Sequence, residues 1–211
     1  MKTANLIERI QRMPEGALFN DATRFDSQYV YSIINSYRAA LIAERYRKEH
    51  TINPVCYQKF YPEFEKDLQI PENVRFRCPN TINILNEDGF RFLGTVDCSI
   101  AFRRIKNRSE LSTVNKHSIM KLRRVPVVLY DGNTELLEVY GNKDLKEMLV
   151  ELIAAEPHAV PTFNFETDQY PLSEDDVPLL EDMIFKANII ASLRTPPDYL
   201  QDRITTPQNV R

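Results

Sequence analysis

The chain has 211 residues, of which 43% are apolar, and 27 Lys and Arg against 30 Asp and Glu give a formal net charge of −3. This length and apolar content suffice for one large domain with its own core. No apolar run approaches the roughly 20 residues of a membrane-spanning helix. The chain has only five Gly, beside 13 Pro, which argues against a glycine-rich phosphate-binding loop. We therefore expect a soluble protein made in the cytoplasm.

The N-terminal part has the pattern of helices. Residues 5–13 form a short amphipathic segment that ends near Pro14. Asp26 or Ser27 is placed to cap a longer helix that runs to about His50. Apolar residues three and four apart predict one buried stripe along it: Val30, Ile33, Ile34, Tyr37 and Leu41. Two ion pairs are predicted on its exposed side, Glu44 with Lys48 and Arg45 with Glu49.

From residue 51 to about residue 140 the pattern changes to β-strands. Residues 55–60 alternate between polar and apolar, and Pro62 ends this strand. Two hairpins are predicted around turn sequences, residues 81–85 with 90–96 around NEDG, and residues 125–130 with 134–140 around DGN.

The segments between and after these hairpins are less regular. Residues 98–105 alternate and predict a strand, whereas the polar residues 106–119 predict a long loop. Residues 145–155 contain good helix formers, but their second half also fits a strand closed by Pro157. We favour the strand for that half.

A second helix is predicted near the C-terminus. A cap at Ser173 would place Pro178 inside the helix, where proline removes a hydrogen bond. A cap at Asp175 or Asp176 places Pro178 in the first turn, so the helix should run from about 175 to 194. Its apolar stripe is Val177, Leu180, Ile184, Ala187 and Ala191. The remaining residues lack a core-forming period and should be mobile unless a partner orders them.

These elements predict a single α+β domain over residues 1–194. Residues 1–50 should be helical, residues 51–160 mainly antiparallel β, and residues 175–194 a C-terminal helix. Residues 195–211 should form an extended tail.

Charge is sorted along this chain. Residues 103–124 contain one acid, Glu110, and residues 147–185 contain ten acids and no Lys or Arg. The basic block comprises Arg103, Arg104, Lys106, Arg108, Lys116, Lys121, Arg123 and Arg124. Such blocks favour head-to-tail contact between copies, or contact of the basic block with DNA; a solvated loop is the simpler interpretation. Glu174, Asp175 and Asp176 are the candidate acidic interface. They could also bind a divalent cation, although helix capping explains these acidic residues with fewer assumptions.

Catalytic motifs are missing from the sequence. GxGxxG, GxxxxGK[ST], HExxH and GxSxG do not occur, and we predict no cofactor and no metal site. A zinc site from Cys56, Cys78, Cys98 and a histidine would lack closely paired ligands. Free thiols in a reducing compartment are the favoured interpretation, and a disulfide with one leftover thiol is the weaker one. A small enzyme using the distant residues Asp97, Glu166 and His158 is an alternative that the spacing does not support.

Three segments resemble a known family. INSYRAALIAERY (34–46), INPVCYQ (52–58) and DQYPLSEDDVPLLEDMIFKANIIASLRTPPDYLQD (168–202) are similar to head-to-tail connector proteins of crAss-like tailed phages. The resemblance implies a virion structural protein of the neck, assembled in the host cytoplasm, with no catalytic site. It implies a ring of twelve copies around the DNA channel, in contact with the portal protein and with other connector ring or tail proteins.

The alternative is a non-enzymatic DNA-binding accessory protein that uses residues 103–124. Phosphate contacts would make its affinity depend steeply on salt. Tyr and Phe are not interleaved in this segment, which argues against stacking on single-stranded bases. The overall pI of 5.7 argues against a dedicated nucleic-acid binder.

Overall fold

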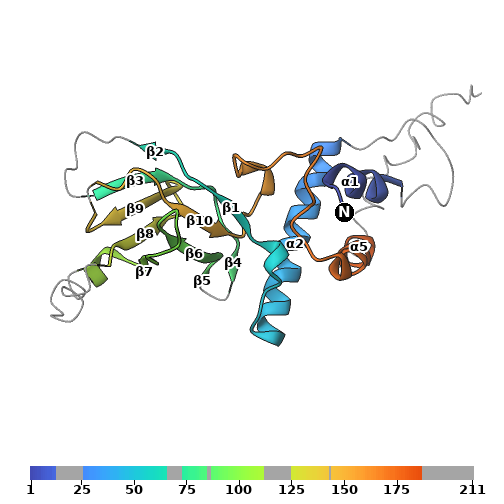
Figure 1. Ribbon diagram of the computed structural model, residues 1–211. Coiled ribbons are helices and arrows are strands. Elements are labelled where there is room, and N and C mark those ends of the chain that lie inside the picture. The colour runs from blue at the N-terminus through green and yellow to red at the C-terminus, as the bar shows by residue number, and fades with distance from the viewer. Residues whose placement is uncertain (13–25, 66–72, 85–86, 112–124, 143, 187–211) are drawn as a thin grey trace, which may run out of the picture.

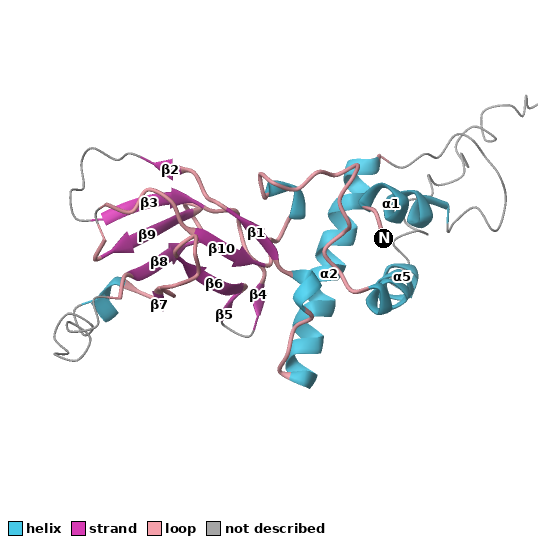
Figure 2. Ribbon diagram, viewed as in Figure 1, coloured by secondary structure: helices cyan, strands magenta, loops and turns pink. Residues whose placement is uncertain are grey.

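The fold is α+β, with helices gathered in one lobe and strands in another (Figures 1 and 2). The computed structural model describes residues 1–12, 26–65, 73–84, 87–111, 125–142 and 144–186. The predicted tail, the predicted helical residues after Lys186 and most of the predicted loop 106–119 lie outside the described residues.

The helical lobe contains, among the described residues, α1 (Thr3–Arg12), α2 (Ser27–Glu49) and α5 (Val177–Lys186). The side chain of Asp26 accepts a hydrogen bond from the backbone N–H of Gln28, as an N-cap does. His50 ends α2 in the left-handed conformation, with φ 54°. The short 3₁₀ turn η4 (Glu174–Asp176) leads into α5 and places Pro178 in its first turn. The Asp26 cap and the place of Pro178 in the first turn are confirmed. The predicted cap at Asp175 or Asp176 is wrong, because these residues belong to η4, whose N-cap position is Ser173.

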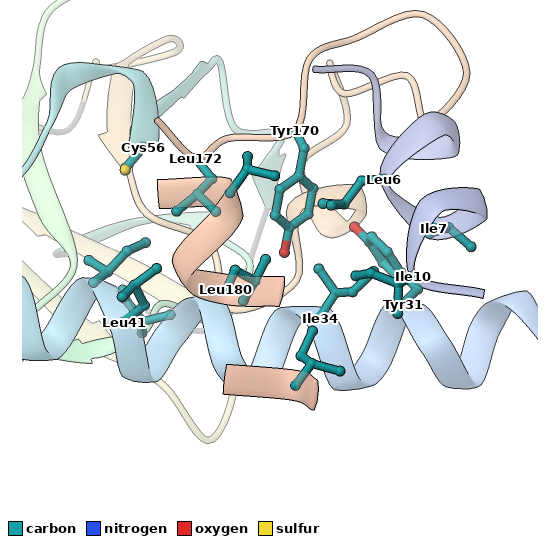
Figure 3. Close-up of a cluster of buried hydrophobic side chains, with 14 of the residues drawn as sticks. Leu6, Ile7, Ile10, Tyr31, Ile34, Leu41, Cys56, Tyr170, Leu172 and Leu180 are labelled. Atoms are coloured by element: carbon teal, nitrogen blue, oxygen red, sulfur yellow. The ribbon is translucent and has the colours of Figure 1, made fainter. Parts of the chain in front are cut away.

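The helical lobe has its own hydrophobic cluster, which Figure 3 shows in close-up. α1 and α5 both contact α2. Ile153 and the residues around the short strand β4 (Asn83–Ile84) add side chains from the β region. Its most buried members include Leu6, Ile34, Ile153, Leu180 and Ile184. The N- and C-terminal parts of the chain are thus joined by one helical core, as the buried stripes of α2 and α5 predict.

The strands in the described part of the chain form three sheets. The three-stranded sheet is antiparallel, in the order β1 (Gln58–Phe60), β10 (Leu149–Leu152), β6 (Phe90–Gly94). The five-stranded sheet has the order β2 (Phe64–Glu65), β3 (Asn73–Arg77), β9 (Leu136–Tyr140), β8 (Val127–Asp131), β7 (Arg103–Ile105). Among the strands of the described residues, β7 and β8 alone pair in parallel. The two-stranded sheet joins β4 to β5 (Glu87–Asp88).

The hairpin around DGN is confirmed, because β8 pairs with β9 and Asp131 lies opposite Leu136. The hairpin around NEDG is wrong. β4, which lies in the predicted first strand, pairs with β5 inside the NEDG turn, whereas β6 pairs with β10 and places Leu93 opposite Val150. All four residues of β10 are buried, so β6 gains more apolar contact there than from a local partner.

Two other strands are shorter than predicted. Residues 54–56 form the 3₁₀ turn η2 (Pro54–Cys56), so only β1 remains of the predicted strand 55–60. Cys98 lies in a turn with φ 58°, which leaves β7 as the strand portion of residues 98–105. The favoured strand in residues 145–155 is confirmed as β10.

The two larger sheets enclose a second hydrophobic cluster. The backbone N–H of Phe102 donates to the carbonyl of Leu93 at 2.7 Å and links the two sheets. Phe60, Phe76, Leu137, Val150 and Leu152 are among its buried members. The side chain of Ile153 joins the helical cluster while that of Ala154 joins the β cluster, so the two cores meet directly after β10.

One end of the β lobe lies away from the helices. β10 runs toward the helical core, because Ile153 follows it. Its antiparallel neighbour β6 therefore runs away from the helices, and the turn of residues 95–100 follows its far end. Arg103, which begins β7, pairs with Val127 at the start of β8 and lies at the same end. We call this the distal end.

Candidate interaction surfaces

The described part of the basic block lies on β7 and the residues that follow it. Arg103 and Lys106 are exposed. Arg104 is half-buried, and its guanidinium lies 5.9 Å from the centre of the Phe90 ring. Lys116, Lys121, Arg123 and Arg124 lie outside the described residues. The structure therefore describes four of the eight residues of the predicted basic block, and the first of them, Arg103, lies at the distal end.

Arg108 is tied to the five-stranded sheet by a buried carboxylate. Its Nη2 donates to both carboxylate oxygens of Glu138, at 3.0 and 3.1 Å. Arg75 Nη2 lies 3.0 Å from Oε1 of the same carboxylate, and the Tyr140 hydroxyl donates to Oε2 at 2.6 Å. The side chain of Glu138 is only 6% exposed. This network anchors the helical residues 108–111 on the outer face of the sheet, so Arg108 already has an internal partner.

The three residues of the predicted acidic interface have different environments. The Glu174 side chain is 82% exposed and lies 3.5 Å from the α-amino group of Met1. Asp175 is exposed. Asp176 is buried and lies 2.6 Å from Nη2 of Arg45. The accessible acidic surface in this turn therefore consists of Glu174 and Asp175.

The Arg45–Asp176 pair corrects a predicted contact. Arg45 reaches Asp176 of η4 rather than Glu49 on its own helix, because the carboxylate of Asp176 is buried beside α2 and needs a cation. The other predicted pair, Glu44 with Lys48, is confirmed at 2.7 Å.

Other acids of the C-terminal block are also neutralised within the chain. Glu151 lies 2.7 Å from Lys59 and 3.8 Å from Arg91. Glu181 lies 2.9 Å from Arg9. The separation of charge along the sequence is therefore partly used in folding, where it joins the C-terminal part to the N-terminal half.

Stability should depend on the ionisation of Asp176. Burial raises the pKa of Asp176, and nearby Arg45 lowers it by less; Asp175 and Glu49 also raise it. A folded-state pKa above the unfolded value of about 3.9 means that the folded state binds more protons. Stability should therefore fall as pH rises from about 4 through the raised pKa.

The variant Asp176→Asn should lack this loss. In urea titrations between about pH 4 and pH 7, its stability relative to the natural chain should increase with pH. Asp144→Asn, at an exposed aspartate outside this turn, is the matched control and should show no such trend. A stability difference that is independent of pH would contradict the assignment.

A buried arginine joins the two lobes. Arg38 is fully buried on α2, and it donates from Nε to the carbonyl of Pro171 and from Nη1 to the carbonyl of Ala154, both at 2.9 Å. Its guanidinium also lies 5.7 Å from the centre of the Tyr170 ring. Nη2 of Arg38 has no hydrogen-bond partner among the described residues. Through Arg38, α2 is thereby connected to Ala154, which follows β10, and to Pro171, which precedes η4.

Tyr170, beside Arg38, forms a further buried polar contact within the helical core. Its hydroxyl donates to Oδ1 of Asn35 at 2.8 Å, and burial raises its pKa strongly. The sequence prediction did not include Arg38, Asn35 or Tyr170. A signal was present, since Arg38 falls four residues after Ile34 and three before Leu41, on the apolar stripe itself.

The candidate catalytic residues lie in separate parts of the structure. Asp97 accepts hydrogen bonds from Ser99 in the distal turn. The ring of His158 lies 5.3 Å from that of Tyr31 on α2, and Glu166 lies in a turn stabilised by Asn164. The structure therefore does not assemble the alternative catalytic site.

Two cavities occur next to buried thiols. One of about 440 Å³ is lined by Cys78, Arg77 and Glu135 among others, and one of about 310 Å³ by Cys56, Arg45 and Asp176. Burial raises the pKa of both thiols, which makes them weak nucleophiles near neutral pH. Cys98 is exposed, and all three thiols are free. Within the described residues, no group of three or more His, Cys, Asp or Glu could hold a metal ion.

Apolar side chains are exposed at both ends of the molecule. At the distal end they are Val96 (42% exposed), Ile100 (45%) and Val125 (37%). On α5 they are Leu179 (46%) and Phe185 (60%). Large hydrophobic side chains exposed elsewhere are Tyr29, Val55, Tyr61 and Phe64. Exposed apolar groups rimmed by charge are typical of protein contact surfaces.

No helix of the described segments is long and apolar enough to cross a membrane. No model of a known protein family matches the sequence, and no curated protein matches it.

Proposed function

We propose that this protein is a structural subunit of a phage head-to-tail connector. Copies of the chain form a ring of twelve between portal and tail, around the channel through which DNA passes. The basis for the family and for the copy number is the resemblance of residues 34–46, 52–58 and 168–202. The portal protein and other ring or tail proteins are the proposed partners.

The observation that favours this function is the polarity of the molecule. One end exposes Val96, Ile100 and Arg103, and the α5 end exposes Leu179 and Asp175. A closed ring requires heterologous contacts, in which one surface meets a different surface of the next copy. Two unlike surfaces at separate ends of one chain meet that requirement.

Mass spectrometry of purified particles tests the proposal. The chain should be present in the virion at a copy number that matches the portal, and imaging of the neck should place it beside the portal. Its absence from particles that contain portal and tail proteins would refute the proposal.

The exposed basic residues Arg103 on β7 and Lys106 directly after it support a secondary, nonspecific contact with genomic DNA. If Arg103 and Lys106 contact phosphates, replacing both with Ala should reduce the slope of log affinity against log salt by about 2. Arg47→Ala with Lys48→Ala, which also removes two exposed cations, is the control and should leave the slope unchanged. Equal slopes for all three proteins would exclude this surface as the DNA contact.

A further inference from the structure

We infer that the cavity of about 440 Å³ in the β lobe binds a linear aliphatic polyamine, a ligand whose ammonium groups are separated by methylene chains. The lining comes from β1 and β2, the end of β3, the turn between β8 and β9, and residues 159–161. Its volume lies within the range of small-molecule sites, about 300–1,000 Å³. The inference does not depend on the connector proposal, which concerns assembly of the chain.

The lining combines a buried apolar base with rigid walls. Phe60 and Cys78 are each 1% exposed and form the base. Pro62, Pro79 and Pro161 also line the cavity, and the ring of proline fixes its φ angle. The cavity is therefore largely formed before a ligand binds, which lowers the entropic cost of binding. Methylene groups of a ligand gain free energy by leaving water for such a surface.

The charged part of the lining is negative. Glu63, Glu65 and Glu135 line the cavity, and Arg77 is the single cation among its described lining residues. Arg77 Nη2 lies 3.3 Å from Oε1 of Glu65 and neutralises one carboxylate. Three carboxylates less one guanidinium leave two negative charges at the cavity, those of Glu63 and Glu135.

Both remaining carboxylates belong to residues whose backbone is fixed. The N–H of Arg77 donates to the carbonyl of Glu63 at 3.1 Å, and the N–H of Cys78 donates to the carbonyl of Glu135 at 2.8 Å. Within the described residues, the exposed carboxylate of Glu63 has no cation as a partner. The carboxylate of Glu135 accepts from Nδ2 of Asn80 at 2.7 Å, and this neutral partner leaves its charge in place. Each can therefore accept a charge-assisted hydrogen bond from an ammonium group.

The spacing of the carboxylates favours several separate charges over one metal ion. In the part of the chain that the structure describes, no three His, Cys, Asp or Glu side chains are grouped closely enough to hold a metal ion. The three carboxylates therefore do not converge on one point. A polyamine matches this arrangement, because its ammonium groups can reach separate carboxylates while its methylene chain lies on the apolar base, as the stem of a lysine does.

Calorimetric titration of the full chain with spermidine tests the inference. Combining Glu63→Gln with Glu135→Gln should weaken binding by about 10-fold, since each exposed ion pair contributes a few-fold. Gln at position 135 can still accept from Asn80. The matched control combines Glu147→Gln with Glu166→Gln, which removes two exposed carboxylates elsewhere and should leave the affinity unchanged. Absence of binding by the natural chain, or equal weakening by the two double variants, would overturn the inference.

Filling the cavity should block the ligand without removing a charge. Ala159 is exposed and lines the cavity, so Ala159→Trp should abolish spermidine binding. Ala40→Trp makes the same change at an exposed position of α2 and should bind as the natural chain does. Circular dichroism should show that both variants fold. Undiminished binding by Ala159→Trp would mean that the ligand does not occupy the cavity, and the inference would be wrong.

The chemical class of the ligand is tested with two further probes. Butylamine has a methylene chain but a single ammonium group, and it should bind at least about 10-fold more weakly than spermidine because it reaches one carboxylate only. Magnesium ions at the concentration of spermidine should not displace it. If butylamine binds as tightly, or if magnesium displaces spermidine, the cavity is not a polyamine site.

Discussion

Replacing Arg38 with Ala should lower the free energy of unfolding by about 4 kcal/mol, since it leaves a cavity and two buried carbonyl oxygens without donors. These carbonyls belong to Ala154 and Pro171, and both accept from Arg38 at 2.9 Å. Each buried acceptor left unpaired costs about 1–3 kcal/mol. Urea titration followed by circular dichroism measures the change.

Arg47→Ala is the matched control, because Arg47 lies on the same helix but is exposed. That variant should change stability by no more than about 0.5 kcal/mol. Arg38→Met, which fills most of the space without donating, should fall between the two. If Arg38→Ala and Arg47→Ala had equal effects, the proposed link between the lobes would be wrong.

Replacing Glu138 with Ala should lower stability by about 3–5 kcal/mol, because it leaves the half-buried Arg75 without its carboxylate. The Arg75 side chain is only 18% exposed, so water compensates little. The Tyr140 hydroxyl loses its acceptor as well. Thermal or urea unfolding measures the loss, and Glu147→Ala at an exposed position is the control.

The partners of Glu138 should differ in their effects. Arg108→Ala should cost less than about 1 kcal/mol, since that side chain is 70% exposed and its pair is screened by water. Combining Arg75→Leu with Glu138→Leu should be less harmful than Glu138→Ala alone, because removing both members leaves no unpaired charge. If the double variant were the least stable, burial of an unpaired charge would not explain the effect.

The helices show how much could be predicted from local patterns. The apolar spacing of α2, its Asp26 cap and the position of Pro178 in α5 are all properties of short segments, and each is confirmed. The DGN hairpin is equally local, since two adjacent strands flank a turn that closes on itself.

The NEDG hairpin shows where local patterns are insufficient. Residues 90–94 do form a strand, yet their partner is β10, more than 50 residues later in the chain. Turn residues indicate where the chain can reverse, but they do not say which strand offers the most apolar surface. Pairing with β10 places Leu93 against Val150, and no pattern within residues 81–96 contains that information.

The charged residues also show what local patterns can and cannot predict. The blocks in residues 103–124 and 147–185 are visible in the sequence, and they led to the expectation of two opposed surfaces. Their internal use is not visible, because Arg45 with Asp176, Lys59 with Glu151 and Arg9 with Glu181 are pairs between distant segments.

The sequence by itself determined the helices, the Asp26 cap of α2, the α+β class and the charge blocks, since each depends on neighbours within a few residues. Tertiary structure alone decided the strand order and the burial of Arg38 and Glu138. It also decided which charged and apolar side chains remain at the two ends. Those outcomes depend on contacts between residues far apart in the chain, which form only when the two cores assemble.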